Sequence, residues 1–240
     1  MTKAAKLGHN MTGAQMSPDD TQSMVDYTER RPADVPGDAQ ELKRAREHMN
    51  REEGDIGSVP IPGSAKGMLK TTFDKVLGNN PEVLVDKLGE RLAYERTGVR
   101  LYEALIAKAQ ACESGGAELV PTLQQIRNDE QAHMFLLINA IETLGADPTA
   151  MTPGADVIGV LGSGPLKVIT DPRTNMAQAL NAILTIELAD NAAWELLIKL
   201  AEQSGHPKIA RSFDGALVEE ERHVNTIRSL LTRELGLSNP

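Results

Sequence analysis

The stretch EQAH at residues 130–133 decides how this chain folds, because it recurs as EERH at residues 220–223. In an α-helix, residues i and i+3 lie on one face about one turn apart, so each Glu-x-x-His motif can direct a carboxylate and an imidazole at one point. A single glutamate precedes each motif: Glu95 lies 35 residues before the first, and Glu187 lies 33 residues before the second. The two copies supply four carboxylates and two imidazoles, which is the ligand set of a dinuclear metal site inside a four-helix bundle.

The two copies also agree at the aromatic residue that follows each single glutamate. Tyr102 stands seven residues after Glu95, and Trp194 stands seven residues after Glu187. The interval from each single glutamate to its motif has room for one helix of about six turns, a short reversal and part of a second helix. Each copy is therefore predicted to form an antiparallel helical hairpin, and two hairpins make an all-α four-helix bundle.

Helical periodicity and glycine stops predict where the four long helices lie. They span about residues 82–113, 118–145, 174–204 and 207–235, with a long connection of residues 146–175 in the middle. A connection of that length inside a compact domain is usually a crossover or functional. It carries seven large aliphatic residues, so we expect it to pack on the bundle or on a second subunit: Val157, Ile158, Val160, Leu161, Leu166, Val168 and Ile169.

The N-terminal part of the chain has a different composition. Residues 1–65 carry few large apolar side chains and many charged, Pro and Gly residues, so they are predicted to form a flexible, largely unstructured arm before the bundle domain of residues 66–240. Within the arm, residues 39–53 can form a helix that is polar on all faces. Residues 67–77 space their apolar side chains as a short helix that docks on the bundle.

Composition excludes several functional classes. With 40% apolar and 25% charged residues, the chain is typical of a soluble globular protein. A net charge of −9 argues against nucleic-acid binding, which needs a clustered basic surface. The single cysteine, Cys112, excludes an intrachain disulfide and any Cys-x-x-Cys metal site. No signal peptide and no run of about 18 apolar residues is present, so we expect a cytoplasmic protein that does not enter the membrane.

The donor set favours particular metals. Carboxylate oxygens are hard ligands and imidazole is borderline, so iron or manganese suits the site. We expect Glu130 and Glu220 to bridge two cations about 3.5–4 Å apart, with Glu95 and Glu187 as terminal ligands. The six predicted metal ligands are Glu95, Glu130, His133, Glu187, Glu220 and His223.

The alternative interpretation is that these residues are solvated charges on helix surfaces. We favour that interpretation for Glu103, Glu195, Glu219 and Glu221. It fits the six ligand positions poorly, because their neighbours in the helical repeat are apolar. Burial of an unpaired carboxylate costs several kcal/mol, so inward-facing Glu and His residues must be paired or metal-bound.

Further residues lie close to the predicted ligands in sequence. Asp129 and Glu219 immediately precede the two bridging glutamates, where each can accept the N–H of a ligating imidazole or remain a surface acid. The two aromatic residues, Tyr102 and Trp194, are either core packing or hydrogen-bonding and redox-active groups beside the metals.

One turn after the terminal glutamates the copies differ, with Gly98 in the first and Asp190 in the second. One interpretation is close helix packing at Gly98 and solvent exposure at Asp190. The other is an open pocket above one metal and an additional oxygen ligand beside the other.

The residues that carry a family resemblance are Glu95, Tyr102, Glu130, His133, Glu187, Glu220 and His223. Over residues 82–235 this set resembles the ferritin-like superfamily, in particular its bacterioferritin and rubrerythrin branch. The resemblance implies a ferritin-like bundle with two iron ions per chain, or manganese or a mixed Mn/Fe pair. It also implies reaction with dioxygen or hydrogen peroxide, as a peroxidase, ferroxidase or oxidase, with Tyr102 as the candidate catalytic residue.

The sequence also departs from relatives in that branch. Rubrerythrins commonly add a rubredoxin module with two Cys-x-x-Cys knuckles, which one cysteine cannot build, so electrons must come from an external donor or from ferrous iron. Some eighty residues precede the bundle, which favours a homodimer over a storage cage. The leading hypothesis is therefore a cytoplasmic di-iron oxidoreductase. An iron-binding or storage protein is the second, and a non-catalytic ferritin-like structural module is the third.

Overall fold

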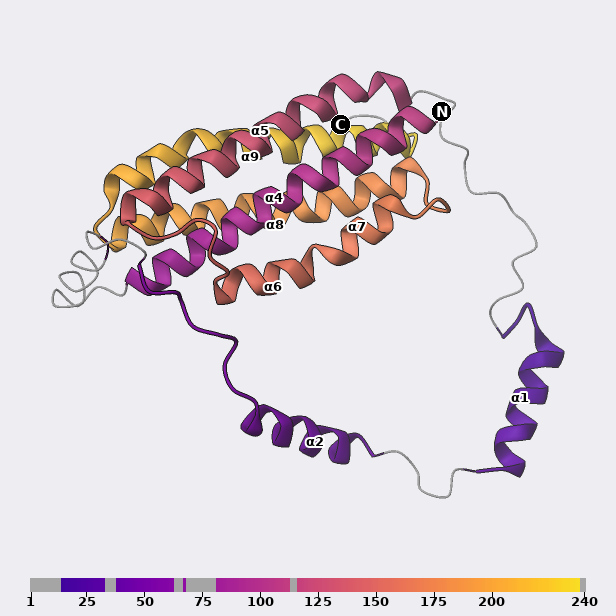
Figure 1. Cartoon of the computed structure of the whole chain (residues 1–240). Coiled ribbons are helices and arrows are strands. Elements are labelled where there is room, and N and C mark those ends of the chain that lie inside the picture. The colour runs from indigo at the N-terminus through magenta and orange to yellow at the C-terminus, as the bar shows by residue number, and fades with distance from the viewer. Residues whose placement is uncertain (1–13, 33–37, 63–66, 68–80, 113–115, 238–240) are drawn as a thin grey trace. The chain divides into compact units, whose positions relative to one another are not determined.

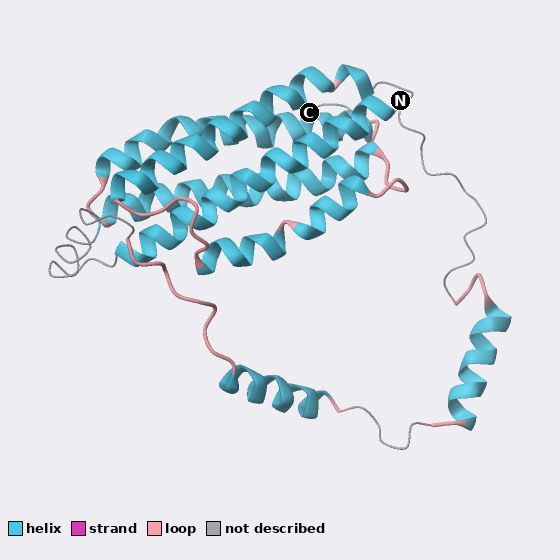
Figure 2. Ribbon diagram, viewed as in Figure 1, coloured by secondary structure: helices cyan, strands magenta, loops and turns pink. Residues whose placement is uncertain are grey.

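The computed structural model describes residues 14–32, 38–62, 67, 81–112 and 116–237. This part of the chain is helical, and it contains no β-strand. Figures 1 and 2 show helices near the N-terminus and a bundle formed by the helices from residue 81 onward. The helices are α1 (Pro18–Arg30), α2 (Ala39–Glu52), α4 (Pro81–Ala111), the 3-10 helix η1 (Gly116–Glu118), α5 (Val120–Leu144), α6 (Pro153–Leu161), α7 (Ser163–Thr170), α8 (Met176–Gln203) and α9 (Pro207–Glu234).

The four long helices form two antiparallel hairpins, as the sequence predicts. Helix α4 packs along α5, and α8 packs along α9, while α4 also contacts α8 and α5 contacts α9 (Figure 1). The observed bounds lie within two residues of the predicted ones. Helix α5, the second of the four long helices, ends at Gly145, whose φ of 80° is the left-handed conformation that favours glycine. A capping box between Asn175 and Gln178 starts α8.

The core of the bundle consists of two apolar layers with a polar band between them. One layer includes Leu88 of α4 and Phe213 of α9, and the other includes Leu105 of α4 and Ile227 of α9. The buried acidic and histidine residues come from the middle of the same four helices. Both ends of the bundle are therefore closed by hydrocarbon, and water is kept from the polar band.

The long connection folds into α6 and α7, which pack against α4; α7 also contacts α8. Thr152 caps the start of α6 by accepting a hydrogen bond from Ala155 N, and Lys108 of α4 donates to the carbonyls of Asp171 and Thr174 beyond α7. The expected packing is confirmed for two of the predicted apolar side chains, Ile158 (6% exposed) and Ile169 (0%).

Other apolar residues of this connection do not pack on the bundle of the same chain, because only one side of a short helix can reach it. Packing of these residues on a second subunit stays a prediction. The exposed fractions are 40% for Val157, 71% for Val160, 61% for Leu161 and 38% for Val168.

The N-terminal helices belong to a compact unit separate from the one that begins at Ile56. Helix α2 forms within the predicted polar segment, whereas α1 was not predicted, and neither helix has a buried residue. The predicted short helix at residues 67–77 lies outside the described residues, except for Gly67. The domain division at residue 65 stays a prediction. Among the described helices, none combines the length and the apolar run needed to cross a bilayer.

Candidate metal centre

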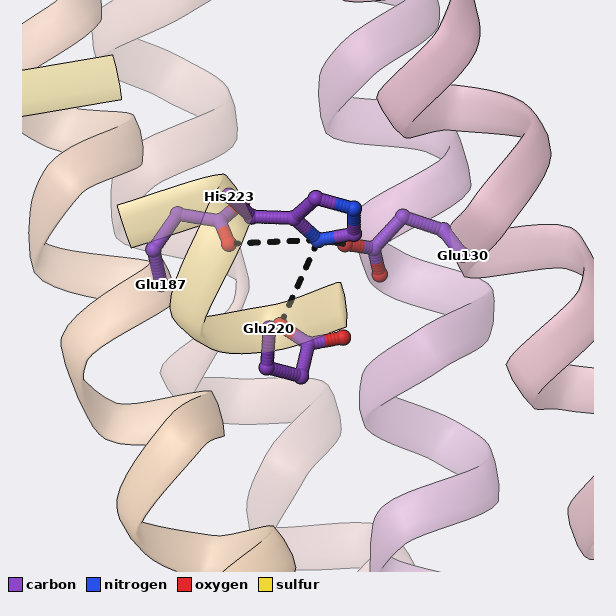
Figure 3. A group of neighbouring side chains, drawn as sticks. All are labelled: Glu130, Glu187, Glu220 and His223. Atoms are coloured by element: carbon purple, nitrogen blue, oxygen red, sulfur yellow. Dashed lines mark ion pairs between the residues drawn. The ribbon is translucent and has the colours of Figure 1, made fainter. Parts of the chain in front are cut away.

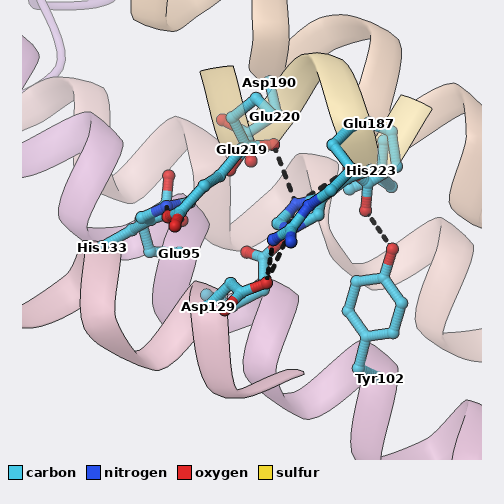
Figure 4. Close-up of polar contacts among 12 residues, drawn as sticks. Glu95, Tyr102, Asp129, His133, Glu187, Asp190, Glu219, Glu220 and His223 are labelled. Atoms are coloured by element: carbon cyan, nitrogen blue, oxygen red, sulfur yellow. Dashed lines mark hydrogen bonds and ion pairs between the residues drawn. The ribbon is translucent and has the colours of Figure 1, made fainter. Parts of the chain in front are cut away.

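The structure brings all six predicted ligands together in the middle of the bundle. Glu95 comes from α4, Glu130 and His133 from α5, Glu187 from α8, and Glu220 and His223 from α9, and each is at most 2% exposed. Figure 3 shows three carboxylates around the ring of His223, and Figure 4 shows the wider set.

The ligand atoms divide into two overlapping groups. Atoms of Glu95, His133 and Glu220 lie within 4.8 Å of one another in one group. In the other group, the atoms that lie within 4.8 Å of one another come from Glu130, Glu187, Glu220 and His223. Glu220 belongs to both groups, which is the position that a bridging carboxylate must occupy. Two cations can therefore be held side by side, each by three or more protein atoms.

Both imidazoles face this centre with Nδ1. His133 Nδ1 lies 2.8 Å from Glu220 Oε1 and 3.6 Å from Glu95 Oε2. His223 Nδ1 lies 3.5 Å from Glu220 Oε2, 3.6 Å from Glu130 Oε1 and 3.7 Å from Glu187 Oε2.

Most of the atoms that face the centre take part in ion pairs, but none of them has a hydrogen-bond partner among the described residues. The set comprises Glu95 Oε2, Glu130 Oε2, His133 Nδ1, Glu187 Oε2, both Glu220 oxygens and His223 Nδ1. Buried polar atoms are almost always hydrogen-bonded, and an uncompensated one costs about 1–3 kcal/mol. Every predicted ligand contributes at least one such atom, and all converge on one point. The residues therefore fit a pair of metal ions.

The outer nitrogen of each imidazole meets a carboxylate from the other motif. His133 Nε2 lies 2.8 Å from Glu219 Oε2, and His223 Nε2 lies 3.2 Å from Asp129 Oδ2. Arg222 donates a 2.6 Å hydrogen bond to the same Asp129 oxygen. A carboxylate at Nε2 holds the proton there and leaves the Nδ1 lone pair for a metal. Of the two sequence interpretations for Asp129 and Glu219, the geometry favours imidazole partners, although Glu219 remains half-exposed.

Each of the two aromatic residues donates a hydrogen bond to the terminal glutamate of the other sequence repeat. The hydroxyl of Tyr102 donates to Glu187 Oε1, and the indole Nε1 of Trp194 donates to Glu95 Oε1 over 3.0 Å (Figure 4 shows the tyrosine contact). Both aromatic side chains are fully buried. Each repeat thus orients the terminal carboxylate of the other, which goes beyond simple core packing.

Burial and mutual repulsion distribute protons unevenly over the metal-free site. Burial raises the pKa of Glu130 well above its ordinary value and that of Glu187 to about 8. Burial alone would lower the pKa of His133, but the Glu220 and Glu95 carboxylates raise it to about 11. Burial opposes ionisation of Glu220, yet the two adjacent imidazoles lower its pKa to about 2. Because metal ligands bind in deprotonated form, entering cations displace these protons.

The two positions that differ between the repeats both face the centre. A Cβ added to Gly98 would lie 2.2 Å from Glu130 Oε2, so this glycine leaves room for the predicted bridging carboxylate. Asp190 is 1% exposed, and its Oδ1 lies 2.7 Å from Nη1 of Arg91. Sequence reasoning missed Arg91. Its signal was a cation one helical turn before Glu95, between Leu88 and Leu92 in an apolar stripe.

Comparison with known proteins gives a family for this arrangement. Among solved structures, the chain is similar to the stress protein YciF of E. coli, with 19% identity, coverage of 66% of this chain and 98% of that chain, and a TM-score of 0.54. It is also similar to ferritin like, diiron-carboxylate proteins from Bacillus anthracis str. Ames, with 21% identity, coverage of 62% and 94%, and a TM-score of 0.49.

No curated protein sequence matched. The model of the family described as the ferritin-like domain matches residues 85–235, which is 151 of the 240 residues of the chain. This interval begins within the first turns of α4 and ends one residue beyond α9. It therefore contains most of α4, all of α5, α8 and α9, and all six candidate ligands. The chain therefore belongs to the ferritin-like family.

Proposed function

We propose that this protein binds two iron ions per chain in the bundle centre and uses them to reduce hydrogen peroxide or dioxygen. The observation that carries the proposal is the convergence of buried carboxylate and imidazole atoms that have no hydrogen-bond partner among the described residues. Four carboxylates balance the charge of two divalent cations when both imidazoles are neutral. Hard oxygen and borderline nitrogen donors favour iron or manganese over softer metals.

The bound ions supply the electrons for this chemistry. The chain provides the geometry around them. Glu95 and Glu187 each have one oxygen fixed by an aromatic donor and the other directed inward. The imidazole of His133 is held in one tautomer by Glu219, and the apolar layers on either side exclude bulk water.

Tyr102 contacts this set of ligands through its side-chain hydroxyl. Its buried hydroxyl donates to Glu187, and burial raises its pKa well above the ordinary value. The hydroxyl therefore stays protonated at neutral pH and is held directly beside a terminal ligand. We assign Tyr102 the role of the hydrogen-bond donor that holds Glu187 in place during the reaction.

The proposal includes partners that the chain itself does not supply. With one cysteine, the chain cannot build a cysteine-ligated electron carrier, so an external donor must return electrons after each turnover. The exposed aliphatic residues of α6 and α7 support a homodimer. The acidic composition argues against a nucleic-acid partner, and the proposal places the protein in the cytoplasm without a membrane partner.

Metal analysis and an optical spectrum of protein purified from its own host test the proposal directly. We expect about two metal ions per chain and, after reduction, oxidation by hydrogen peroxide or dioxygen. A large excess of iron per chain in a high-mass particle would indicate storage instead. A reduced centre that is stable to both oxidants, or a chain without metal, would leave the structural-module interpretation.

A further inference from the structure

Arg91 places a permanent positive charge in the wall of the metal centre. It lies on α4, is 3% exposed, and its guanidinium carbon is 4.0 Å from the centre of the Tyr94 ring. Nη1 is 2.7 Å from Asp190 Oδ1, and Nε is 3.5 Å from Glu95 Oε1. A buried guanidinium is stable only beside compensating negative charge, and here two carboxylates supply it.

Asp190 adds a fifth buried carboxylate to the four glutamates. Its carboxylate and those of Glu95, Glu130 and Glu220 have oxygens within 4.8 Å of one another, the same closeness as in the two ligand groups described above. The contact with Arg91 is an ion pair without hydrogen-bond geometry, and Asp190 Oδ1 has no hydrogen-bond partner among the described residues. By position, Asp190 is therefore as available to a cation as the predicted ligands are.

The charges explain why the centre needs a separate cation at this point. Four glutamates and two divalent ions sum to zero, and so do Asp190 and Arg91. Without the guanidinium, the fifth carboxylate would have only the metal ions to compensate it. A neighbouring opposite charge within about 4–6 Å changes the free energy of a charged group by the equivalent of about 1–3 pKa units.

We propose that Arg91 is a positioning residue that withholds Asp190 from the metal ions, so that removing its charge turns Asp190 into an additional metal ligand. The inference rests on the proposed metal binding. The positioning role and a purely structural role of Arg91 predict opposite changes in metal affinity when Arg91 is replaced. Loss of a structural residue would loosen the site and weaken metal binding, whereas release of Asp190 strengthens it.

Mn²⁺ titration by calorimetry tests the inference without any turnover. Arg91→Met keeps the bulk of the side chain and removes its charge, and we expect it to bind Mn²⁺ at least about tenfold more tightly than the unmodified chain. Asp190→Asn leaves Arg91 uncompensated beside the ions, and we expect binding at least about tenfold weaker. The double variant restores a neutral pair and should return to within about threefold of the unmodified protein.

Two control variants separate charge from position. Arg91→Lys keeps the charge and should leave Mn²⁺ affinity close to that of the unmodified protein. Arg127→Met removes an equal charge from α5, where Arg127 pairs with the exposed Glu103, and should have no effect. The metal-free Arg91→Met protein should also melt at a lower temperature, because the buried carboxyl groups of Asp190 and Glu95 then lack their guanidinium partner.

Several results would overturn the inference. One is weaker or unchanged Mn²⁺ binding by a folded Arg91→Met variant, and another is a double variant that keeps the gain. If Arg91→Met does not fold, Asp190→Asn alone decides, since unchanged or tighter binding by that variant contradicts the inference. These outcomes leave the proposed function intact when the unmodified protein binds two Mn²⁺ ions. Absence of binding by the unmodified protein would overturn both.

Discussion

The indole nitrogen of Trp194 donates a 3.0 Å hydrogen bond to Oε1 of Glu95, which lies 99 residues earlier in the chain. The other oxygen of that carboxylate, Oε2, points into the centre without a hydrogen-bond partner among the described residues. Tyr102 and Glu187 repeat the arrangement in the opposite direction. Each aromatic donor therefore occupies one oxygen of a terminal carboxylate and leaves the other for a metal ion.

Substitution of the shared carboxylate should reduce metal stoichiometry. We expect Glu220→Ala to lower metal content from about two ions per chain to one or fewer, since Glu220 belongs to both ligand groups. Glu130→Ala should act in the same direction. Glu103→Ala is the control, because Glu103 is exposed and pairs with Arg127. Metal analysis after dialysis checks the result, and full occupancy in both Glu220→Ala and Glu130→Ala would refute the ligand assignment.

The absence of a side chain at Gly98 should be needed for metal binding and not for the stability of the helix. Replacement of a mid-helix glycine by alanine stabilises a helix by about 1 kcal/mol, but at Gly98 the new methyl group would meet Glu130 Oε2 at 2.2 Å. The carboxylate is the end of a flexible side chain and can move away. We therefore expect Gly98→Ala to keep or raise the melting temperature of the metal-free protein and to weaken metal binding.

Gly215 provides the matched control, since it is exposed on α9 and an added Cβ would meet no atom within 4 Å. Gly215→Ala should raise the melting temperature and leave metal binding unchanged. Equal metal affinity in the Gly98 and Gly215 variants would show that Glu130 does not need the space above Gly98.

The sequence predicted the bundle, and it predicted that the Glu and His of each motif share a helix face, because both depend on local spacing. Residues three apart on a helix share a face, so the side chains of Glu130 and His133 point in the same direction once the helix has formed. The crosswise contacts were not predictable in this way. Which carboxylate reaches His133 depends on how α5 and α9 are aligned, and the sequence does not encode that alignment in any single segment.

Arg91 escaped sequence reasoning for a related reason. A lone arginine in an amphipathic helix normally lies at the surface, and its partner Asp190 is 99 residues away on another helix. Val160 and Leu161 show what periodicity leaves open. Their apolar character predicted packing on the bundle or on a second subunit, and the bundle of the same chain does not cover them, because a short helix lying on α4 has only one inner face.

The metal-free protein should lose stability as pH rises. The pKa of Glu187 is about 8 in the folded chain against an ordinary 4.5, so its contribution is complete below pH 4.5 and is lost as pH rises through 8. His133, raised from 6.5 to about 11, acts in the same direction at higher pH. The free energy of unfolding should fall by about 1.4 kcal/mol per pH unit for each such group within its window.

Thermal unfolding of the metal-free protein at pH 5, 6.5 and 8.5 measures this effect. Glu187→Gln should flatten the profile between pH 5 and 8. The metal-loaded protein should behave oppositely, because deprotonated ligands bind metal more tightly. A metal-free protein that becomes more stable from pH 5 to 8.5 would contradict the proton distribution described here.

Removal of the N-terminal helices should leave the metal centre intact. Neither α1 nor α2 has a buried residue, and all six candidate ligands lie beyond residue 94. We expect a chain lacking residues 1–55 to keep its helical circular dichroism and about two metal ions. An insoluble or metal-free product would show that this segment supports the bundle, and the prediction would then be wrong.

Tyr102 should affect the reaction more than metal binding. Tyr102→Phe removes the hydroxyl that donates to Glu187 and leaves a buried carboxylate oxygen unpaired, at a cost of about 1–3 kcal/mol. The inward oxygen of Glu187 remains, so metal content should stay near two ions. Tyr94→Phe is the matched control on the same helix, because the Tyr94 hydroxyl donates to the Ile186 carbonyl over 2.8 Å and not to a carboxylate.

Stopped-flow absorbance of the reduced, iron-loaded proteins mixed with hydrogen peroxide separates these two tyrosines. We expect the unmodified protein and Tyr94→Phe to share the same oxidation and decay phases, while Tyr102→Phe slows or diverts the later phase, because Glu187 is then no longer held by the Tyr102 hydroxyl. Turnover should stop after one oxidation until an external reductant is added. Identical late phases in all three proteins would show that the hydrogen bond from Tyr102 to Glu187 has no part in the reaction.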